Sequence, residues 1–187
     1  MINFKSKKIL IWDFDGTIVD LKVDWKSMKN TLISEILSPR FPLFYRLMPI
    51  SLMISRINPD KREVYLNIIK RFEKNASYQI NEDALKVIKF YRLDKQMYIL
   101  SDNLNSTIKA ILNNLGISEY FLDIIAKDDV NTPKPSNEGL LSLLKKNNIK
   151  DKDKVVVIGD SWKDNIIAYR CGIDFFHVRR LEEWKRN

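Results

Sequence analysis

The amino-acid sequence predicts an α/β fold in three layers, with a parallel β-sheet between helices and a small all-helical domain inserted after the first strand. Over residues 82–187, short apolar runs rich in β-branched residues alternate with segments of helical pattern, which is typical of right-handed βαβ units. Residues 21–81 instead hold longer helix-compatible segments, broken by four prolines, and no convincing strand. We therefore expect a core domain of residues 1–20 and 82–187 and a helical domain of residues 21–81.

The expected elements follow from local patterns. An apolar run with β-branched and aromatic residues predicts a buried strand at residues 8–13. The clearest strand is residues 155–158, where four consecutive aliphatic side chains end at Gly159. Gly172 indicates the end of a helix, and Ser136 is a suitable N-cap for another. In chain order we expect strand 8–13, helix 81–93, strand 97–101, helix 105–115, strand 121–126, helix 136–147, strand 155–158, helix 163–171 and strand 175–178.

Composition narrows the function classes. The 187 residues include 32 Lys and Arg against 24 Asp and Glu, a formal net charge of +8. Such a charge fits nucleic acid, an anionic membrane surface or small anionic ligands, but the chain has no long block of like charge, and we expect no nucleic-acid partner. A single cysteine and a single histidine exclude an intramolecular disulfide framework and a Cys/His zinc cluster.

Neither of the two apolar stretches predicts a membrane span or an export signal. The run that begins at Ile9 is interrupted by Asp13, and the stretch at residues 47–55 falls well short of the roughly 20 apolar residues that a spanning helix needs. We expect a cytoplasmic protein that is a monomer or a homodimer.

Polar residues follow three of the expected strands, at the edge where ligands gather in parallel sheets. These segments are Asp13-Phe-Asp15-Gly16-Thr17 after the first strand, Ser101-Asp102-Asn103 after the second and Gly159-Asp160-Ser-Trp-Lys-Asp164 after the fourth, while Lys134 lies in the loop after the third. Carboxylates placed this close repel one another, so we expect a hard divalent cation, Mg²⁺, to hold them together. The cation and Lys134 would neutralise a phosphate that approaches a carboxylate nucleophile. The residues therefore indicate metal-assisted phosphoryl transfer through an aspartyl-phosphate.

Taken in order over nearly the whole chain, these four motifs resemble those of the haloacid dehalogenase superfamily, and within it the phosphoglycolate-phosphatase-like branch with a helical cap. The resemblance implies a Rossmann-like core, with residues 21–81 as the cap. It implies that Asp13 is the nucleophile. It also implies that Asp15 protonates the leaving oxygen and later deprotonates the water that hydrolyses the aspartyl-phosphate.

The same resemblance implies two sets of ligands. The Mg²⁺ ligands would be the carboxylate of Asp13, the backbone carbonyl of Asp15, Asp160 and, directly or through water, Asp164. The substrate phosphate would contact Ser101, Lys134, the backbone N–H of Asp102 and the Thr17 region, with Thr17 also steadying Asp15.

Asp15 favours a phosphatase over a dehalogenase, because a departing halide needs no proton donor. The chain departs from the family pattern at Asp102, where Asn is frequent, and at Ser136, where no second proline follows Pro135. We expect Mg²⁺-dependent hydrolysis of a small phosphorylated metabolite. One alternative is a phosphomutase, which uses the same motifs and differs in how water is excluded. A less favoured alternative is a non-catalytic basic binding module, which would have no need of the intact motifs.

Overall fold

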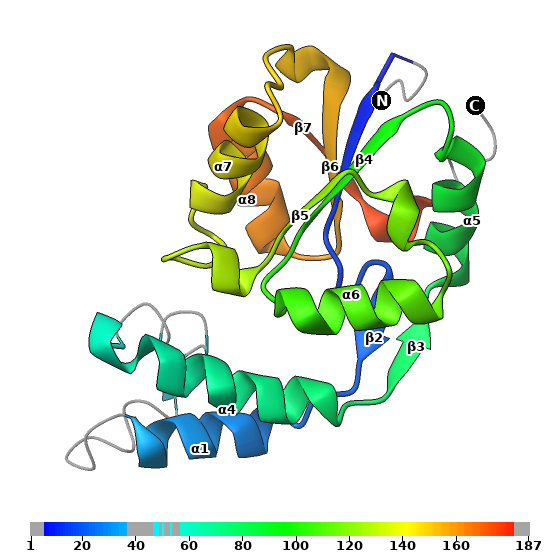
Figure 1. Ribbon diagram of the computed structural model, residues 1–187. Coiled ribbons are helices and arrows are strands. Elements are labelled where there is room, and N and C mark those ends of the chain that lie inside the picture. The colour runs from blue at the N-terminus through cyan, green and yellow to red at the C-terminus, as the bar shows by residue number, and fades with distance from the viewer. Residues whose placement is uncertain (1–5, 37–46, 49, 51–52, 54–56, 182–187) are drawn as a thin grey trace. The chain divides into compact units, whose positions relative to one another are not determined.

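Figure 1 shows a computed structural model that describes residues 6–36, 47–48, 50, 53 and 57–181. The chain divides into two compact units: a core unit of residues 1–20 and 78–187, and an inserted unit of residues 21–77. The apolar stretch at residues 47–55 lies mostly outside the described residues. None of the described helices is long and apolar enough to span a membrane.

The core unit is built on a five-stranded sheet in which every neighbouring pair of strands is parallel. Its strands are β1 (Ile9–Trp12), β4 (Gln96–Leu100), β5 (Asp123–Ile125), β6 (Val155–Gly159) and β7 (Asp174–His177). Their spatial order is β5-β4-β1-β6-β7, so the first strand lies in the centre. The strand order reverses at β1, and such switch points are where open α/β sheets bind ligands.

Helices cover both faces of this sheet. They are α5 (Glu82–Tyr91), α6 (Asn105–Asn114), α7 (Glu138–Lys146) and α8 (Trp162–Cys171). Successive strand residues point to opposite faces: Ile11, Tyr98 and Val157 pack in one cluster with residues of α7 and α8, whereas their buried neighbours Trp12 and Met97 point the other way. Figure 1 shows α5 and α6 on the side of the sheet opposite α7 and α8. The predicted three-layer fold with a parallel sheet is confirmed.

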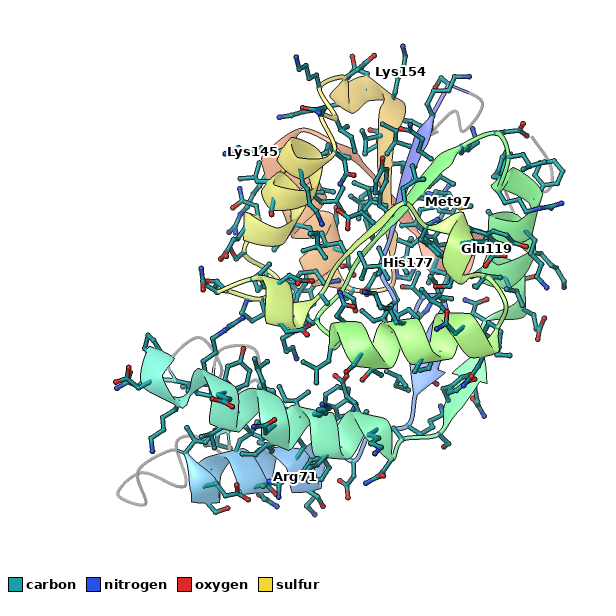
Figure 2. The ribbon with its side chains drawn as sticks, viewed as in Figure 1. Arg71, Met97, Glu119, Lys145, Lys154 and His177 are labelled. Atoms are coloured by element: carbon teal, nitrogen blue, oxygen red, sulfur yellow. The ribbon has the colours of Figure 1, made fainter. Side chains whose placement is uncertain are left out.

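Two of the lysines of the core unit illustrate its exposed surface. In Figure 2, Lys145 on α7 and Lys154 before β6 project outward, whereas Met97 lies in the interior. Short 3-10 helices complete the connections of this unit, at Ser118–Tyr120, Lys127–Asp129, Lys152–Lys154 and Val178–Arg180.

The sequence analysis was wrong in two local details. It expected no strand in residues 21–81, but β3 (Tyr78–Ile80) pairs with β2 (Val19–Leu21). Three residues are too few to establish a period-2 pattern, so these strands depend on their pairing. The N-cap of α7 is Asn137 and not Ser136, although Ser136 Oγ accepts a hydrogen bond from the N–H of Glu138 at 3.2 Å.

Among its described residues, the inserted unit contains two long helices, α1 (Trp25–Glu35) and α4 (Arg62–Lys74), with a 3-10 turn at Pro59–Lys61 leading into α4. The start of α1 is fixed by Asp24, whose carboxylate accepts the N–H of Ser27 at 2.9 Å. The two helices pack on each other through buried apolar side chains, namely Met28, Leu32 and Ile33 of α1 and Tyr65, Ile68 and Ile69 of α4.

Candidate active site

The register of the central strands brings three polar segments to one edge of the sheet. Trp12, the last residue of β1, lies opposite Ile99 of β4 and Ile158 of β6. The chain therefore leaves β1 at Asp13 beside the ends of both neighbouring strands. Asp13 is still held by the sheet, since its N–H donates to the carbonyl of Ile158 at 2.8 Å.

Lys134 connects these segments through its side chain. Its Nζ donates to Asp13 Oδ1 at 2.8 Å, to Asp164 Oδ1 at 2.6 Å and to the carbonyl of Leu100 at 3.2 Å. The ammonium, Asp13 and Asp164 are all buried. Removal of the two carboxylates and the ammonium from water is costly, and this geometry with short charge-assisted hydrogen bonds offsets much of that cost.

Asp13, Asp160, Asp164 and Lys134 form a cluster of three carboxylates and one ammonium. One ligand oxygen each from Asp13, Asp160 and Asp164 lies within 4.8 Å of the others. With Lys134 as the cation bonded to two of them, three negative charges meet one positive charge. The surplus of two negative charges, all on oxygen, fits a hard divalent cation.

The pKa values of the cluster are set first by burial and then by these neighbouring charges. Burial raises the pKa of Asp13 to about 8; Lys134 opposes the shift, and the charge of Asp164 adds to it. Partial burial of its carboxyl group, followed by the charge of Asp164, also raises the pKa of Asp160. Burial alone would lower the pKa of Lys134, but Asp13, Asp164 and Asp102 outweigh it and raise that pKa. A cation bound beside Asp13 and Asp160 would favour their ionised forms.

Asp164 is oriented by protein groups on both of its oxygens. While Oδ1 accepts from Lys134, Oδ2 accepts from the N–H of Ser161 at 3.2 Å and from its hydroxyl, and Ser161 in turn caps α8. Asp160 is exposed, in contrast to the almost fully buried Asp164. Asp160 is therefore the better placed of the two to coordinate a metal directly, and Asp164 the better placed to orient Lys134.

Two glycines allow the carboxylates to come close to the backbone. Gly16 has a φ of +77°, and a Cβ there would lie 2.5 Å from Asp160 Oδ2. A Cβ on Gly159 would lie 2.6 Å from Asp164 Cγ. Any side chain at either position would displace a carboxylate of the cluster.

Asp15 lies in the turn that follows β1 and is half-buried. An isolated bridge between Asp15 and Val19, with the N–H of Gly16 donating to the Val19 carbonyl at 2.7 Å, shapes this turn. Thr17 is buried here, and its hydroxyl has no hydrogen-bond partner among the described residues. A hydrogen bond from this hydroxyl therefore does not supply the support for Asp15 that the sequence led us to expect.

Ser101 is buried at the end of β4 and is bonded to a residue that the sequence analysis did not select. Its hydroxyl donates to Asn103 Oδ1 at 3.0 Å and accepts the N–H of Asn103 at 3.2 Å. Asn103 is itself buried, and its carbonyl accepts the N–H of the buried Lys127 at 2.9 Å. Asn103 stands two positions after Ser101, and the polar triplet 101–103 was the available signal.

The carboxylate of Asp102 accepts hydrogen bonds from two lysines, Lys134 and Lys163. Its Oδ1 accepts the backbone N–H of Lys134 at 2.9 Å, and its Oδ2 accepts Lys163 Nζ at 2.9 Å. Burial alone would raise the pKa of Asp102, but Lys134, Lys163 and Lys127 outweigh it and hold the pKa below its usual value. The sequence analysis assigned no role to Lys163.

Comparison with known proteins supports this description. The model of the haloacid dehalogenase-like hydrolase family matches residues 10–178. A protein named pyrophosphatase PpaX from Listeria welshimeri is 29% identical over 170 residues, covering 83% of this chain and 75% of the relative. A phosphoglycolate phosphatase from Psychrobacter arcticus is 22% identical over 191 residues, covering 90% and 82%.

Solved structures share the fold at low sequence identity. A haloacid dehalogenase-like hydrolase from Streptococcus pneumoniae gives a TM-score of 0.63 at 18% identity, covering 91% of this chain and 84% of the other. CbbY from Rhodobacter sphaeroides, solved with phosphate, gives a TM-score of 0.64 at 15% identity, covering 91% of this chain and 85% of the other. The matched residues 10–178 run from β1 to β7 and include every polar segment at the carboxyl ends of the strands. The chain therefore belongs to the haloacid dehalogenase-like hydrolases.

Proposed function

We propose that this hydrolase is a Mg²⁺-dependent phosphatase that cleaves a small phosphomonoester through an aspartyl-phosphate on Asp13. The observation that carries the proposal is the contact of Asp13 with Lys134 at 2.8 Å, in a cluster with Asp160 and Asp164. The names of the pyrophosphatase and phosphoglycolate phosphatase relatives support cleavage of a phosphoryl group. In this proposal residues 21–81 correspond to the cap domain.

The first step transfers the phosphoryl group to the protein. A carboxylate oxygen of Asp13 forms a bond to phosphorus while the bond from phosphorus to the leaving oxygen breaks, and Asp15 gives its proton to that oxygen. Lys134, already bonded to Asp13, holds the nucleophile in place and offsets the charge of the phosphoryl oxygens. Ser101 and the backbone N–H of Asp102 would donate to those oxygens, once the Ser101 hydroxyl turns away from Asn103.

The second step regenerates Asp13. Asp15, now ionised, takes a proton from a water molecule, whose oxygen forms a bond to phosphorus as the bond from phosphorus to the Asp13 oxygen breaks. Inorganic phosphate leaves, and Asp15 retains the proton for the next cycle.

The residues present fit a bound Mg²⁺. Asp13 and Asp160, with the backbone carbonyl of Asp15, would hold it. Asp164 would support the site through its hydrogen bonds with Lys134 and Ser161. When bound, the cation supplies positive charge that keeps Asp13 ionised and favours the approach of an anionic phosphoryl group.

The test is release of inorganic phosphate from a panel of phosphomonoesters and pyrophosphate, with Mg²⁺ and with EDTA. The wild type is compared with Asp13→Asn and with Asp151→Asn, a matched control whose carboxylate forms only a surface pair with Lys154. We expect Mg²⁺-dependent release that is lost in Asp13→Asn by roughly a thousandfold or more and unchanged in Asp151→Asn. Acid-quenched wild type should carry one phosphoryl group on Asp13, detected by mass spectrometry.

Other outcomes would point elsewhere. Conversion of a sugar phosphate to its isomer without phosphate release would indicate a phosphomutase. Absence of any turnover, together with salt-dependent retention on DNA, would indicate a binding module. Equal turnover by the wild type and Asp13→Asn would overturn the assignment of the nucleophile.

A further inference from the structure

The loop that carries Lys134 has few backbone N–H groups through which it can be anchored. Lys134 lies between Pro133 and Pro135, and proline has no N–H. Of these three residues, only Lys134 can donate from the backbone, and that N–H goes to Asp102 Oδ1 at 2.9 Å. The flanks of the loop are held separately: Glu138 accepts the N–H of Thr132 at 2.9 Å, and the carbonyl of Pro135 accepts from Arg170 of α8 at 3.1 Å.

The other oxygen of the same carboxylate bonds to α8. Asp102 Oδ2 accepts Lys163 Nζ at 2.9 Å, and the two side chains are only 22% and 27% exposed. One carboxylate thus joins the end of β4, the Lys134 loop and the first turn of α8. The side chain of Lys134 connects the same elements, because its Nζ donates to the carbonyl of Leu100 at the end of β4 and to Asp164 of α8.

We propose that Asp102 and Lys163 form a clamp that fixes the backbone of Lys134, and that Lys163 is a positioning residue for the hydrolytic reaction. The clamp rests on the proposed function, but its effect on the Lys134 backbone does not. It assigns a role to the acidic side chain of Asp102, one of the two positions at which the chain departs from the family pattern.

The clamp has an electrostatic reason as well as a geometric one. Asp102 directly follows Ser101, so its carboxylate would repel a phosphate bound at the end of β4. The ammonium of Lys163 neutralises this charge and directs one oxygen toward the N–H of Lys134. Without Lys163, Asp102 would turn toward solvent or toward another cation, and the Lys134 loop would lose its central anchor.

The experiment removes the charge of Lys163 and follows Lys134 directly. Lys163→Met keeps most of the length of the side chain and cannot pair with Asp102, whereas Lys163→Arg keeps the pairing. Lys154→Met is the matched control, since Lys154 forms an ion pair with Asp151 at 3.1 Å but lies before β6, at the opposite edge of the sheet (Figure 2). The first readout is hydrogen exchange of the Lys134 amide, measured by NMR on the full chain.

We expect the Lys134 amide to exchange faster in Lys163→Met than in the wild type, and at the wild-type rate in Lys163→Arg and Lys154→Met. The midpoint of thermal unfolding should stay within about 4 °C of the wild type, because a partly exposed ion pair contributes little to stability. Unchanged exchange in Lys163→Met would overturn the clamp, whatever the activity of the protein.

The second readout is steady-state kinetics. We expect kcat and kcat/KM to fall together in Lys163→Met, by roughly tenfold to a hundredfold, because a misplaced Lys134 weakens binding of the transition state. Lys163→Arg should restore most of the activity. Adding Asp102→Asn to Lys163→Met should cause little further loss, since both changes open the same clamp; fully additive losses would contradict it. If the wild type proves inactive on every substrate, the proposed function fails, and the exchange experiment still decides the clamp.

Discussion

The two ends of the central sheet each hold a buried lysine, in opposite electrostatic settings. At the amino end, Lys7 pairs with one carboxylate, Asp174, and donates to the carbonyl of Asp153. At the carboxyl end, Lys134 meets Asp13 and Asp164, with Asp160 close by. Both lysines are 5% exposed, so burial alone does not distinguish them.

What separates the two ends is the balance of charge. Among the described residues, the ammonium of Lys7 pairs with the carboxylate of Asp174, which is half-exposed, so the charges of this pair are balanced. At the carboxyl end three carboxylates lie close to one ammonium, and burial raises the pKa of Asp13 although Lys134 opposes the shift. Buried charge that is balanced serves the fold, whereas a surplus indicates a site that binds a cation.

The largest effect is expected from removing the ammonium of Lys134 from the carboxylate cluster. Lys134→Met leaves Asp13 and Asp164 buried without a cation, so we expect a loss of about 3 kcal/mol in the free energy of unfolding at pH 8, and a fall in kcat of roughly a hundredfold or more. Urea unfolding and phosphate release measure the two effects. Lys145→Met, on the exposed side of α7 (Figure 2), is the control and should change neither. Stability equal to that of the wild type would argue against a buried charge cluster.

Metal should stabilise the carboxyl end and not the amino end. Relative to EDTA, Mg²⁺ at a hundred times its Kd should raise the free energy of unfolding by about 2.7 kcal/mol. The increase should be much smaller in Asp160→Asn, which removes an exposed ligand from the cluster, and unchanged in Lys7→Met. Thermal unfolding with and without EDTA tests this. An identical increase in Asp160→Asn would place the cation elsewhere.

The pH dependence in EDTA should carry the sign of a raised carboxyl pKa. The pKa of Asp13 is about 8 in the folded protein against an ordinary 3.8, so between these values the folded state holds a proton that the unfolded state lacks. The stability contributed by Asp13 is therefore present below about pH 4 and is lost as the pH rises toward 8. Asp13→Asn should lack this loss, and the two proteins should converge in acid. If the free energy of unfolding of the wild type rose relative to that of Asp13→Asn between pH 5 and pH 8, the raised pKa of Asp13 would be contradicted.

The smallest effect is expected at the balanced end. Lys7→Met removes an ammonium whose partner Asp174 is half-exposed and can be hydrated in its place, so we expect a loss of about 1 kcal/mol in the free energy of unfolding and no change in kcat. Denaturant unfolding and phosphate release check the prediction together. A clear fall in kcat would show that the two ends are coupled.

Much of this architecture could be predicted because the signals are local. The strand at residues 155–158 is a run of aliphatic residues and differs from β6 only by the inclusion of Gly159. The capping of α5 by Asn81 is likewise a pattern of adjacent residues. The short strand β3 and the N-cap of α7 were missed, because three residues carry no period and neighbouring polar residues compete for one cap.

The candidate site likewise has one part that could be predicted from the sequence and one part that could not. Asp13, Asp15 and Asp160 follow buried strands, and parallel strands of one sheet must end at the same edge, so their proximity follows from the pattern of residues. The contacts of Asp102 with Lys163 and with the backbone of Lys134 depend on where a loop and a helix meet the end of β4. No spacing in the sequence encodes those meetings.

By itself, the sequence determined the α/β class, the order of the strands along the chain and the carboxylates at their ends, because hydrophobic periodicity and strand-end position are properties of neighbouring residues. Only the tertiary structure decided the electrostatics. It made Lys134 the partner of Asp13 and Asp164 and left Asp160 exposed, and it turned the carboxylate of Asp102 toward Lys163. The physical reason is that a pKa or an ion pair is set by burial and by distances between residues far apart in the chain, which exist only once the layers have packed.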